Sequence, residues 1–241
     1  MRILALGDIH GKAIWKQFVE NTTADCIVFV GDFIIMKEWF LNKAFRNNLE
    51  DLIAFKRANA NNVHLLIGNH DMPHLYPSVN VQKIISPRMT QLYRDNEDCF
   101  EAAYQNENIL FTHAGVTTGW YKKHQSLIES SFGDSLADKL NALHRSEHYA
   151  VLHERGKSRG GNFKYGGITY ADKEETERGA LSGFTQVVGH TKVPKPMKVK
   201  VDHGSMVYID CLNSVAECLL VDDGELSSVN AEGLGTMSLM G

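Results

Sequence analysis

The chain has 241 residues, of which 43% are hydrophobic and 22% are charged. These proportions are ordinary for a soluble globular protein, and they exclude a disordered or a fibrous chain. The formal net charge of -4 argues against a protein that coats nucleic acid generally, because such proteins carry a basic excess that neutralises phosphates. The length suits one well-buried core and therefore predicts a single domain.

The cysteines and the first residues bear on the cellular compartment. Cys26, Cys99, Cys211 and Cys218 show no C-x-x-C spacing and lie in or beside apolar runs, which is typical of buried free thiols rather than of disulfides or a zinc site. Met1–Leu4 runs directly into an apolar strand, with no long apolar segment and no small-residue cleavage site. We therefore expect no signal peptide, no membrane association and a cytoplasmic location.

In chain order, the first part alternates between strand and helix patterns. Strands are predicted near 2–7, 26–30 and 63–67, and helices near 12–20 and 38–58. This alternation favours a parallel sheet with helices outside it.

The middle of the chain is helical and polar. A further strand is predicted at 108–111, and a polar, helix-rich stretch follows from about 117 to 155. The glycines and charges of Arg155–Gly161 then indicate an exposed loop.

The final third has the period of strands, at 185–188, 197–201, 205–209 and 216–221. In the second of these, apolar residues alternate with lysines, as in a half-exposed antiparallel strand. Asp210, Asp222 and Asp223 are interpreted as acids in turns. We expect the domain to span 1–223 and the Ser- and Gly-rich tail, 224–241, to be loosely ordered.

Five short polar clusters carry histidine, aspartate or asparagine, and each follows an apolar run. They are Gly7–Gly11, Gly31–Asp32, Gly68–Asp71, Thr112–Gly115 and Gly189–Thr191. Because the apolar runs are predicted strands, the polar residues that trail them should meet at one rim of a sheet. Open α/β sheets bind their ligands at that rim.

The residue types in these clusters indicate a metal centre. Carboxylate, amide and imidazole donors together suit manganese, iron or zinc. Asp8 and His10 are two residues apart in an extended segment, so their side chains point to the same side and can reach one ion. Two ions about 3.5–4 Å apart repel and need a shared anionic ligand, for which Asp32 is the candidate.

The order of the clusters, D-x-H, G-D, G-N-H-D/E, H and G-H, resembles the calcineurin-like metallophosphoesterases, and most closely their serine/threonine phosphatase-like branch of bacterial and phage type. The resemblance implies a four-layer α/β sandwich of two mixed sheets flanked by helices, with a dinuclear metal site at one sheet edge. It also implies ligands: Asp8 and His10 for the first metal, Asp32 as the bridge, and Asn69, His113 and His190 for the second. Many relatives carry a further histidine where this chain has Lys192, which implies fewer protein ligands on the first metal.

The resemblance further implies a metal-dependent phosphoesterase that hydrolyses phosphomonoesters. A metal-bridging hydroxide would attack phosphorus directly, and His70 would be the general acid that protonates the leaving alkoxide. We expect two divalent ions, manganese before iron, zinc or nickel. The phosphorylated substrate could be a small molecule, a nucleotide or a phosphoprotein.

One element of the branch is missing. Its second motif usually reads G-D-x-x-D-R-G, with an aspartate that orients the catalytic histidine and an arginine that grips phosphate, whereas this chain has Gly31–Lys37. Asp71 is expected to help order the loop. An anionic substrate still needs a cationic clamp, best supplied by a guanidinium. Arg178 is the first candidate, because its segment looks like the phosphate-contacting segment of serine/threonine phosphatases, and Arg159 is the second.

Two alternatives stay open. One is a nucleotide-directed enzyme of the same fold, either a phosphodiesterase or a dinucleoside polyphosphate hydrolase. The other is a scaffold that binds metal without turnover, which the lost D-R-G element favours and the intact ligands oppose. We expect the segment 117–180 to form a cap over the site and to decide the substrate.

Overall fold

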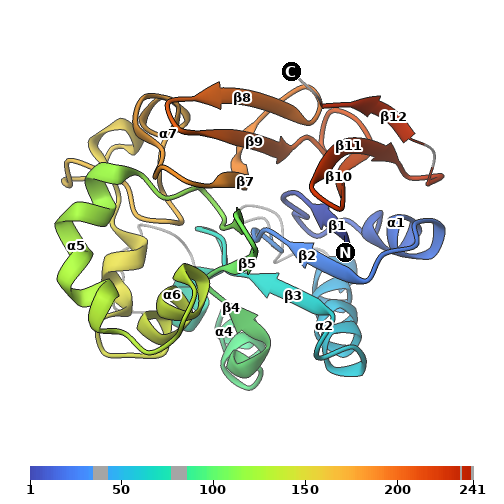
Figure 1. The fold of residues 1–241 in the computed structure, drawn as a ribbon. Helices are drawn as coiled ribbons and strands as arrows, with labels where there is room; N and C mark the ends of the chain where they lie inside the picture. The colour runs from blue at the N-terminus through green and yellow to red at the C-terminus, as the bar shows by residue number, and fades with distance from the viewer. Residues whose placement is uncertain (35–42, 77–85, 234, 240–241) are drawn as a thin grey trace.

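The computed structural model describes residues 1–34, 43–76, 86–233 and 235–239, which form two mixed β-sheets and the helices around them (Figure 1). The predicted helix near 38–58 is described only from Lys43 onward. Residues 35–37 of the altered second motif lie outside the described residues.

The first sheet has seven strands in the order β12-β11-β10-β1-β2-β3-β4. The strands β1, β2, β3 and β4 run parallel to one another, while β10, β11 and β12 pair antiparallel at the other end. Their bounds are β1 (Arg2–Leu6), β2 (Cys26–Phe29), β3 (Val63–Leu66), β4 (Phe100–Glu101), β10 (Glu217–Asp222), β11 (Glu225–Asn230) and β12 (Gly235–Ser238).

The second sheet has five strands in the order β5-β6-β7-β9-β8. Its three inner strands are parallel, and the two edge strands pair antiparallel with them. Their bounds are β5 (Tyr104–Asn106), β6 (Ile109–Phe111), β7 (Thr185–Lys192), β8 (Met197–Val201) and β9 (Gly204–Asp210).

Helices cover the outer faces of both sheets (Figure 1). The α-helices are α1 (Trp15–Asn21), α2 (Lys43–Ala58), α3 (Met72–Leu75), α4 (Pro87–Arg94), α5 (Thr118–Ser130), α6 (Leu136–His144) and α7 (Lys173–Gly179). Short 3-10 helices are η1 (Glu97–Cys99), η2 (Tyr149–His153) and η3 (Lys157–Arg159). Local chemistry starts α6: the Ser135 hydroxyl accepts from the Asp138 N–H and the Asp138 carboxylate accepts from the Ser135 N–H, forming a capping box.

Alternation along β1 shows how the layers pack, because successive side chains of a strand point to opposite faces. Leu4 packs with Phe18 of α1 in an outer core, whereas Ile3 packs with Val207 of the second sheet in the core between the sheets. A third cluster lies where α5 and α6 cover the second sheet. The four-layer α/β sandwich is therefore confirmed.

The prediction of a loosely ordered tail is wrong for the described part of it. β11 pairs with β10 over six positions, from Glu217↔Asn230 to Asp222↔Glu225. The turn between them is Asp223-Gly224, with φ of 45° and 86°, and an Asp-Gly pair with positive φ at both residues is a strong hairpin signal. The Ser and Gly content of the tail concealed this turn.

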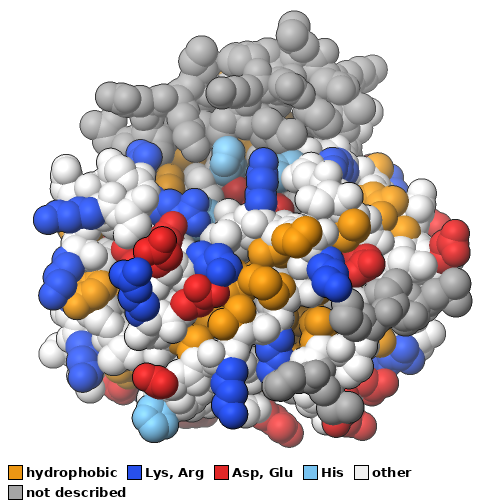
Figure 2. All heavy atoms as spheres, turned by 90° about the horizontal axis from the view of Figure 1, so that it is seen from above, with side chains coloured by type: hydrophobic (Ala, Val, Ile, Leu, Met, Phe, Trp, Pro, Cys, Tyr) orange, Lys and Arg blue, Asp and Glu red, His pale blue; other side chains and the backbone are white. Residues whose placement is uncertain are grey.

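The structure also bears on the cysteines, on membrane-spanning helices and on the distribution of surface charge. All four cysteines are free and buried, as expected. Within the described ranges, the helices are too short or too polar to cross a membrane. Basic and acidic side chains are interspersed over the face of the molecule drawn in Figure 2.

Candidate metal centre

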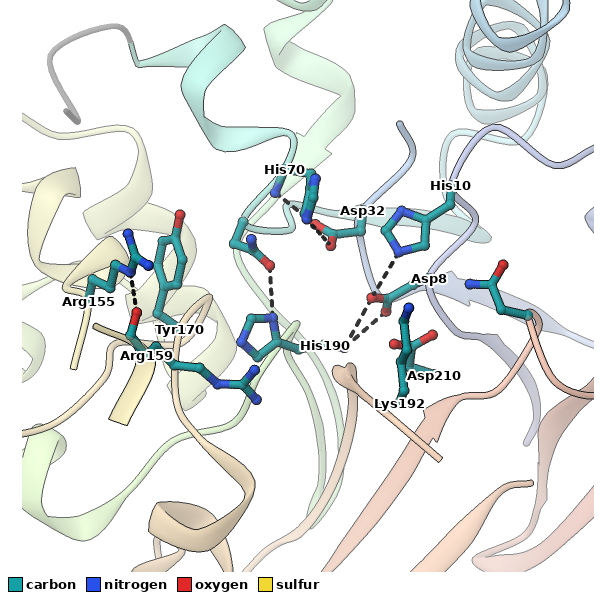
Figure 3. A pocket seen from close by; sticks show the side chains of 12 residues that line it. Asp8, His10, Asp32, His70, Arg155, Arg159, Tyr170, His190, Lys192 and Asp210 are labelled. Carbon is teal, nitrogen blue, oxygen red and sulfur yellow. Dashed lines mark hydrogen bonds and ion pairs between the residues drawn. The ribbon is translucent and has the colours of Figure 1, made fainter. Parts of the chain in front are cut away.

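All six predicted metal ligands lie at one edge of the two sheets, where the carboxyl ends of parallel strands meet. Asp8 and His10 follow β1, Asp32 follows β2, Asn69 follows β3, His113 follows β6, and His190 lies in the last part of β7. Five of the six line a single pocket of about 450 Å³ (Figure 3), and the sixth, His113, is fully buried.

Three of these residues have a left-handed backbone, which is uncommon for residues other than glycine. The φ angles are 47° at His10, 52° at Asp32 and 60° at His190. Hydrogen bonds between the loops hold this conformation; for example, the His10 N–H donates to the Asp32 carbonyl at 2.8 Å. Backbone strain of about 1–3 kcal/mol per residue persists where the surroundings enforce it, and it concentrates at functional sites.

Two glycines make room for the carboxylates. A Cβ at Gly68 would overlap Oδ1 of Asp32, and a Cβ at Gly189 would overlap Oδ1 of Asp8. Any side chain at either position would displace a predicted ligand, so these glycines are needed for close approach.

Asp32 lies at the centre of the site. Its Oδ1 accepts from the His70 N–H at 2.8 Å and lies 3.5 Å from Nε2 of His113. Its Oδ2 lies 3.7 Å from Nε2 of His70. Donor atoms of Asp8, Asp32 and His113 all lie within 4.8 Å of one another, so these three side chains could hold a divalent ion together.

On one side of Asp32, three donor atoms converge on a small volume. Oδ1 of Asn69 lies 3.0 Å from Nε2 of His113 and 2.8 Å from Nδ1 of His190. The Nδ1 of His113 lies 2.8 Å from the Val30 carbonyl, to which it donates when the ring is neutral. Nε2 then faces Asn69 as an acceptor, in the geometry that second-shell hydrogen bonds give to metal-bound histidines.

The donor set fits a divalent ion at this position. Without an ion, Nδ1 of a neutral His190 ring can donate to Oδ1 of Asn69, and the same amide oxygen with two imidazoles is a suitable ligand set for a divalent ion. Burial and the nearby His113 and Arg159 lower the pKa of His190 well below its usual value, which keeps the ring neutral. Its buried Nε2 has no hydrogen-bond partner among the described residues.

On the other side, Asp8 and His10 face each other, with Oδ2 and Nε2 3.8 Å apart. The His10 ring is oriented by a 3.3 Å contact of Nδ1 with the Ile34 carbonyl. Asp8 accepts from the His190 N–H at 3.0 Å, which links the two halves of the site.

The carboxylates have perturbed pKa values that reflect the clustering of charge. Burial, together with Asp210 and Asp32, raises the pKa of Asp8 well above its usual value. Burial acts in the same direction on Asp32, but His113, His70 and His10 outweigh it and lower the pKa of that carboxyl. Buried carboxylates this close together require cations, which two divalent ions would supply.

Asp71 orders the loops, as expected, but through the backbone rather than through His70. Its buried carboxylate accepts from the N–H groups of Asp32, Phe33 and Gly68 at 2.7, 3.0 and 2.9 Å. The Tyr93 hydroxyl donates to it as well. The loops after β2 and β3 are thereby tied together beneath the predicted bridge.

The two candidate arginines lie in different places. Arg159 lines the pocket, with Nε 2.7 Å from Asp172 and a hydrogen bond of 2.8 Å to the Thr191 hydroxyl. Arg178 is not brought to this pocket. Its side chain is 80% exposed, pairs with Glu174 and lines a separate depression. It belongs to the last turn of the seven-residue helix α7.

Five further residues line the pocket without having been predicted as site residues: Arg155, Tyr170, Lys192, Asp210 and Asn213. Arg155 lies over the Tyr170 ring, with its guanidinium carbon 5.9 Å from the ring centroid. The interpretation of Asp210 as a turn acid is wrong, because the residue closes β9 and is only 2% exposed. The signal that could have found it is an apolar run followed by an acid, the pattern already used for the other clusters.

Comparison with known proteins identifies the family and similar folds. The family model of the calcineurin-like phosphoesterases matches residues 1–194. The fold is similar to a cold-active protein-tyrosine phosphatase of a psychrophilic Shewanella species, with a TM-score of 0.60 and 17% identity over 99% of this chain and 80% of that chain. It is also similar to a serine/threonine phosphatase from Saccharomyces cerevisiae, with a TM-score of 0.55 and 14% identity over 95% of this chain and 80% of that chain. No curated protein matches the chain in sequence.

Proposed function

Since the chain belongs to the calcineurin-like phosphoesterase family, we propose that it hydrolyses phosphomonoesters with a pair of divalent ions, manganese first among them. Family membership makes it a metal-dependent phosphoester hydrolase and sets aside the scaffold without turnover. The observation that carries the finer proposal is the convergence of six donor side chains, five of which line one pocket together with His70.

The residues have separate roles in this proposal. One ion would be held by Asp8 and His10, and the other by Asn69, His113 and His190. Asp32 would bind both ions. When bound, the ions supply a water nucleophile that is activated at neutral pH and neutralise charge on the phosphoryl oxygens. Attack on phosphorus is direct, so no phosphoenzyme forms.

His70 is the proposed general acid. Its Nε2 lies 3.7 Å from Oδ2 of Asp32, and the side chain is 26% exposed toward the pocket. From there the ring donates its Nε2 proton to the oxygen of the leaving alcohol as the P–O bond breaks. The ring of His10 meets it edge to face, with centroids 5.5 Å apart, and limits its rotation.

Basic side chains on the pocket wall suit a phosphomonoester dianion. Arg159 is fixed by Asp172 and Thr191, and Arg155 is supported by the Tyr170 ring. We propose that these two guanidiniums replace the missing arginine of the D-R-G element, because a planar guanidinium can bind two phosphoryl oxygens at once. Both belong to the segment 117–180, the proposed cap.

A pair of esters tests the role of His70. With Mn²⁺, His70→Ala should lower kcat for an alkyl phosphate by about 10²–10⁴-fold, because alkoxide is a poor leaving group that needs a proton. The loss for nitrophenyl phosphate should be much smaller, since nitrophenolate leaves without one. His148→Ala, an exposed histidine, is the control. An equal loss on both esters would argue against general-acid catalysis.

The same assays test the substrate class and the clamp. Arg155→Ala should raise KM for the monoester, while Arg178→Ala should leave it unchanged because that side chain lies outside the pocket. Faster turnover of bis-nitrophenyl phosphate than of nitrophenyl phosphate would overturn the monoester assignment in favour of a phosphodiesterase. Absence of turnover with every metal and ester would overturn the catalytic proposal.

A further inference from the structure

Asp210 is the one pocket carboxylate that has no role so far. It ends β9, the third parallel strand of the second sheet, and its carboxylate therefore emerges at the same edge as the other ligands. Figure 3 shows it beside Asp8 and Lys192, directed into the pocket. The residue is only 2% exposed.

The Asp210 carboxylate forms no ion pair within 4 Å among the described residues, although His10 and Lys192 are near enough to attract its charge. Oδ1 of Asp210 has no hydrogen-bond partner among the described residues. The nearby ammonium of Lys12 donates instead to the Leu212 carbonyl at 2.9 Å. An unsatisfied buried carboxylate is strongly unfavourable, so its retention indicates a cation that approaches it.

The backbone brings Asp210 to the Asp8 side of the site. A Cβ at Gly7 would meet the Ile209 carbonyl and would lie 3.2 Å from Cα of Asp210. The missing side chain at Gly7 therefore lets the end of β9 pack directly against the segment that carries Asp8. Asn69, by contrast, contacts His113 and His190 on the other side of Asp32.

The register of β7 and β9 places Asp210 opposite Lys192. Lys192 occupies the position two residues after His190, and an ammonium cannot bind a metal ion. In the pairing of β7 with β9, Lys192 stands opposite Asp210. A carboxylate from the neighbouring strand is thus placed beside the position at which many relatives carry their additional histidine.

We propose that Asp210 is an additional ligand of the ion held by Asp8 and His10. This inference rests on the proposed pair of ions and adds one ligand to it. Asp8, Asp32 and Asp210 would make this position rich in carboxylate oxygens, with His10 its one imidazole. Such a ligand set favours manganese or magnesium over zinc.

Metal titration of the chelated, metal-free protein tests the inference without relying on activity. Calorimetry with Mn²⁺ should detect two ions in the wild type. Asp210→Asn should weaken one of them by about tenfold or more and leave the other unchanged, since loss of a supporting ligand typically lowers affinity 10–100-fold. Asp222→Asn is the matched control, because Asp222 also ends a strand but is exposed.

The possible outcomes separate this inference from the proposed function. Two ions with unchanged affinities in Asp210→Asn, and in Asp210→Ala as a second variant, would overturn the role of Asp210 alone. A wild type that binds no Mn²⁺ would overturn both. The melting temperature of each metal-free variant shows that it is folded, and Asp210→Asn should not melt below the wild type because it removes a buried charge.

Discussion

Asp32 contacts more of the predicted site than Asp8 does, and this difference can be measured. Its two oxygens lie near both His113 and His70, and it is placed between the two sets of donors. The Asp8 carboxylate lies 3.8 Å from Nε2 of His10, and one of its oxygens also lies within 4.8 Å of donor atoms of Asp32 and His113. A bridging carboxylate serves both ions, whereas a terminal one serves a single ion.

We therefore expect Asp32→Asn to cost more Mn²⁺ affinity than Asp8→Asn. The first variant should lose affinity at both positions and the second mainly at one, each by about tenfold or more. Calorimetric titration of the two metal-free variants checks the order. Greater weakening by Asp8→Asn would refute the bridging assignment.

At the same scale, the predicted ligands share a signal that the clamp residues lack. Each ligand cluster follows an apolar run, so its position at a strand end can be predicted from local sequence. Arg159 is fixed by Thr191, which is 32 residues away, and no local pattern predicts such a contact. Arg178 is in a helix that pairs it with Glu174 one turn earlier, although its segment resembled a phosphate-binding one.

Among the elements, β10 agrees with the strand predicted at 216–221, whereas β11 lies in the segment predicted to be a loose tail. Composition suggested a loose tail, but Leu226 and Val229 are buried in two different cores, on opposite faces of the sheet. β10 also pairs with β1, whose loop carries Asp8 and His10. The final strands therefore support the strand on which the site begins.

Leu226→Ala should destabilise the protein by about 2–5 kcal/mol, because it removes a buried side chain and leaves a cavity. Ser227→Ala, the neighbouring and only half-buried position, should change the free energy of unfolding little. Urea unfolding of both variants measures the difference. Equal stability of Leu226→Ala and the wild type would mean that the tail does not belong to the folded core in solution.

For the whole molecule, the fold was predictable because strand-helix alternation and the motif order agree on one architecture. The altered D-R-G element is visible in the sequence, and Arg159 is the second candidate there for its replacement, whereas Arg155 and Lys192, which also line the pocket, carry no signal that marks them as candidates. Packing of the helical layer also buries histidines that belong to none of the five clusters. Burial lowers the pKa of His74 and of His144 to about 4 each.

Because these histidines are buried in the neutral form, the free energy of unfolding should fall as the pH is lowered. The ring of His144 has a pKa of about 4 in the folded state and about 6.5 when unfolded. Between these two pH values the unfolded state binds a proton that the folded state does not bind. The contribution of His144 to the free energy of unfolding is therefore fully present above pH 6.5 and is lost as the pH falls toward 4. The slope is about 1.4 kcal/mol per pH unit for one group.

His144→Gln isolates this term, because other titrating groups, including the clustered carboxylates, are common to the variant and the wild type. The variant loses the Tyr76 contact with the ring and should be the less stable protein at pH 7.5. Its deficit in unfolding free energy should then shrink by roughly 1–2 kcal/mol between pH 6.5 and pH 5. Urea titrations of both metal-free proteins at several pH values measure it. A deficit that stays constant over this range would show that His144 is protonated equally in the folded and unfolded states.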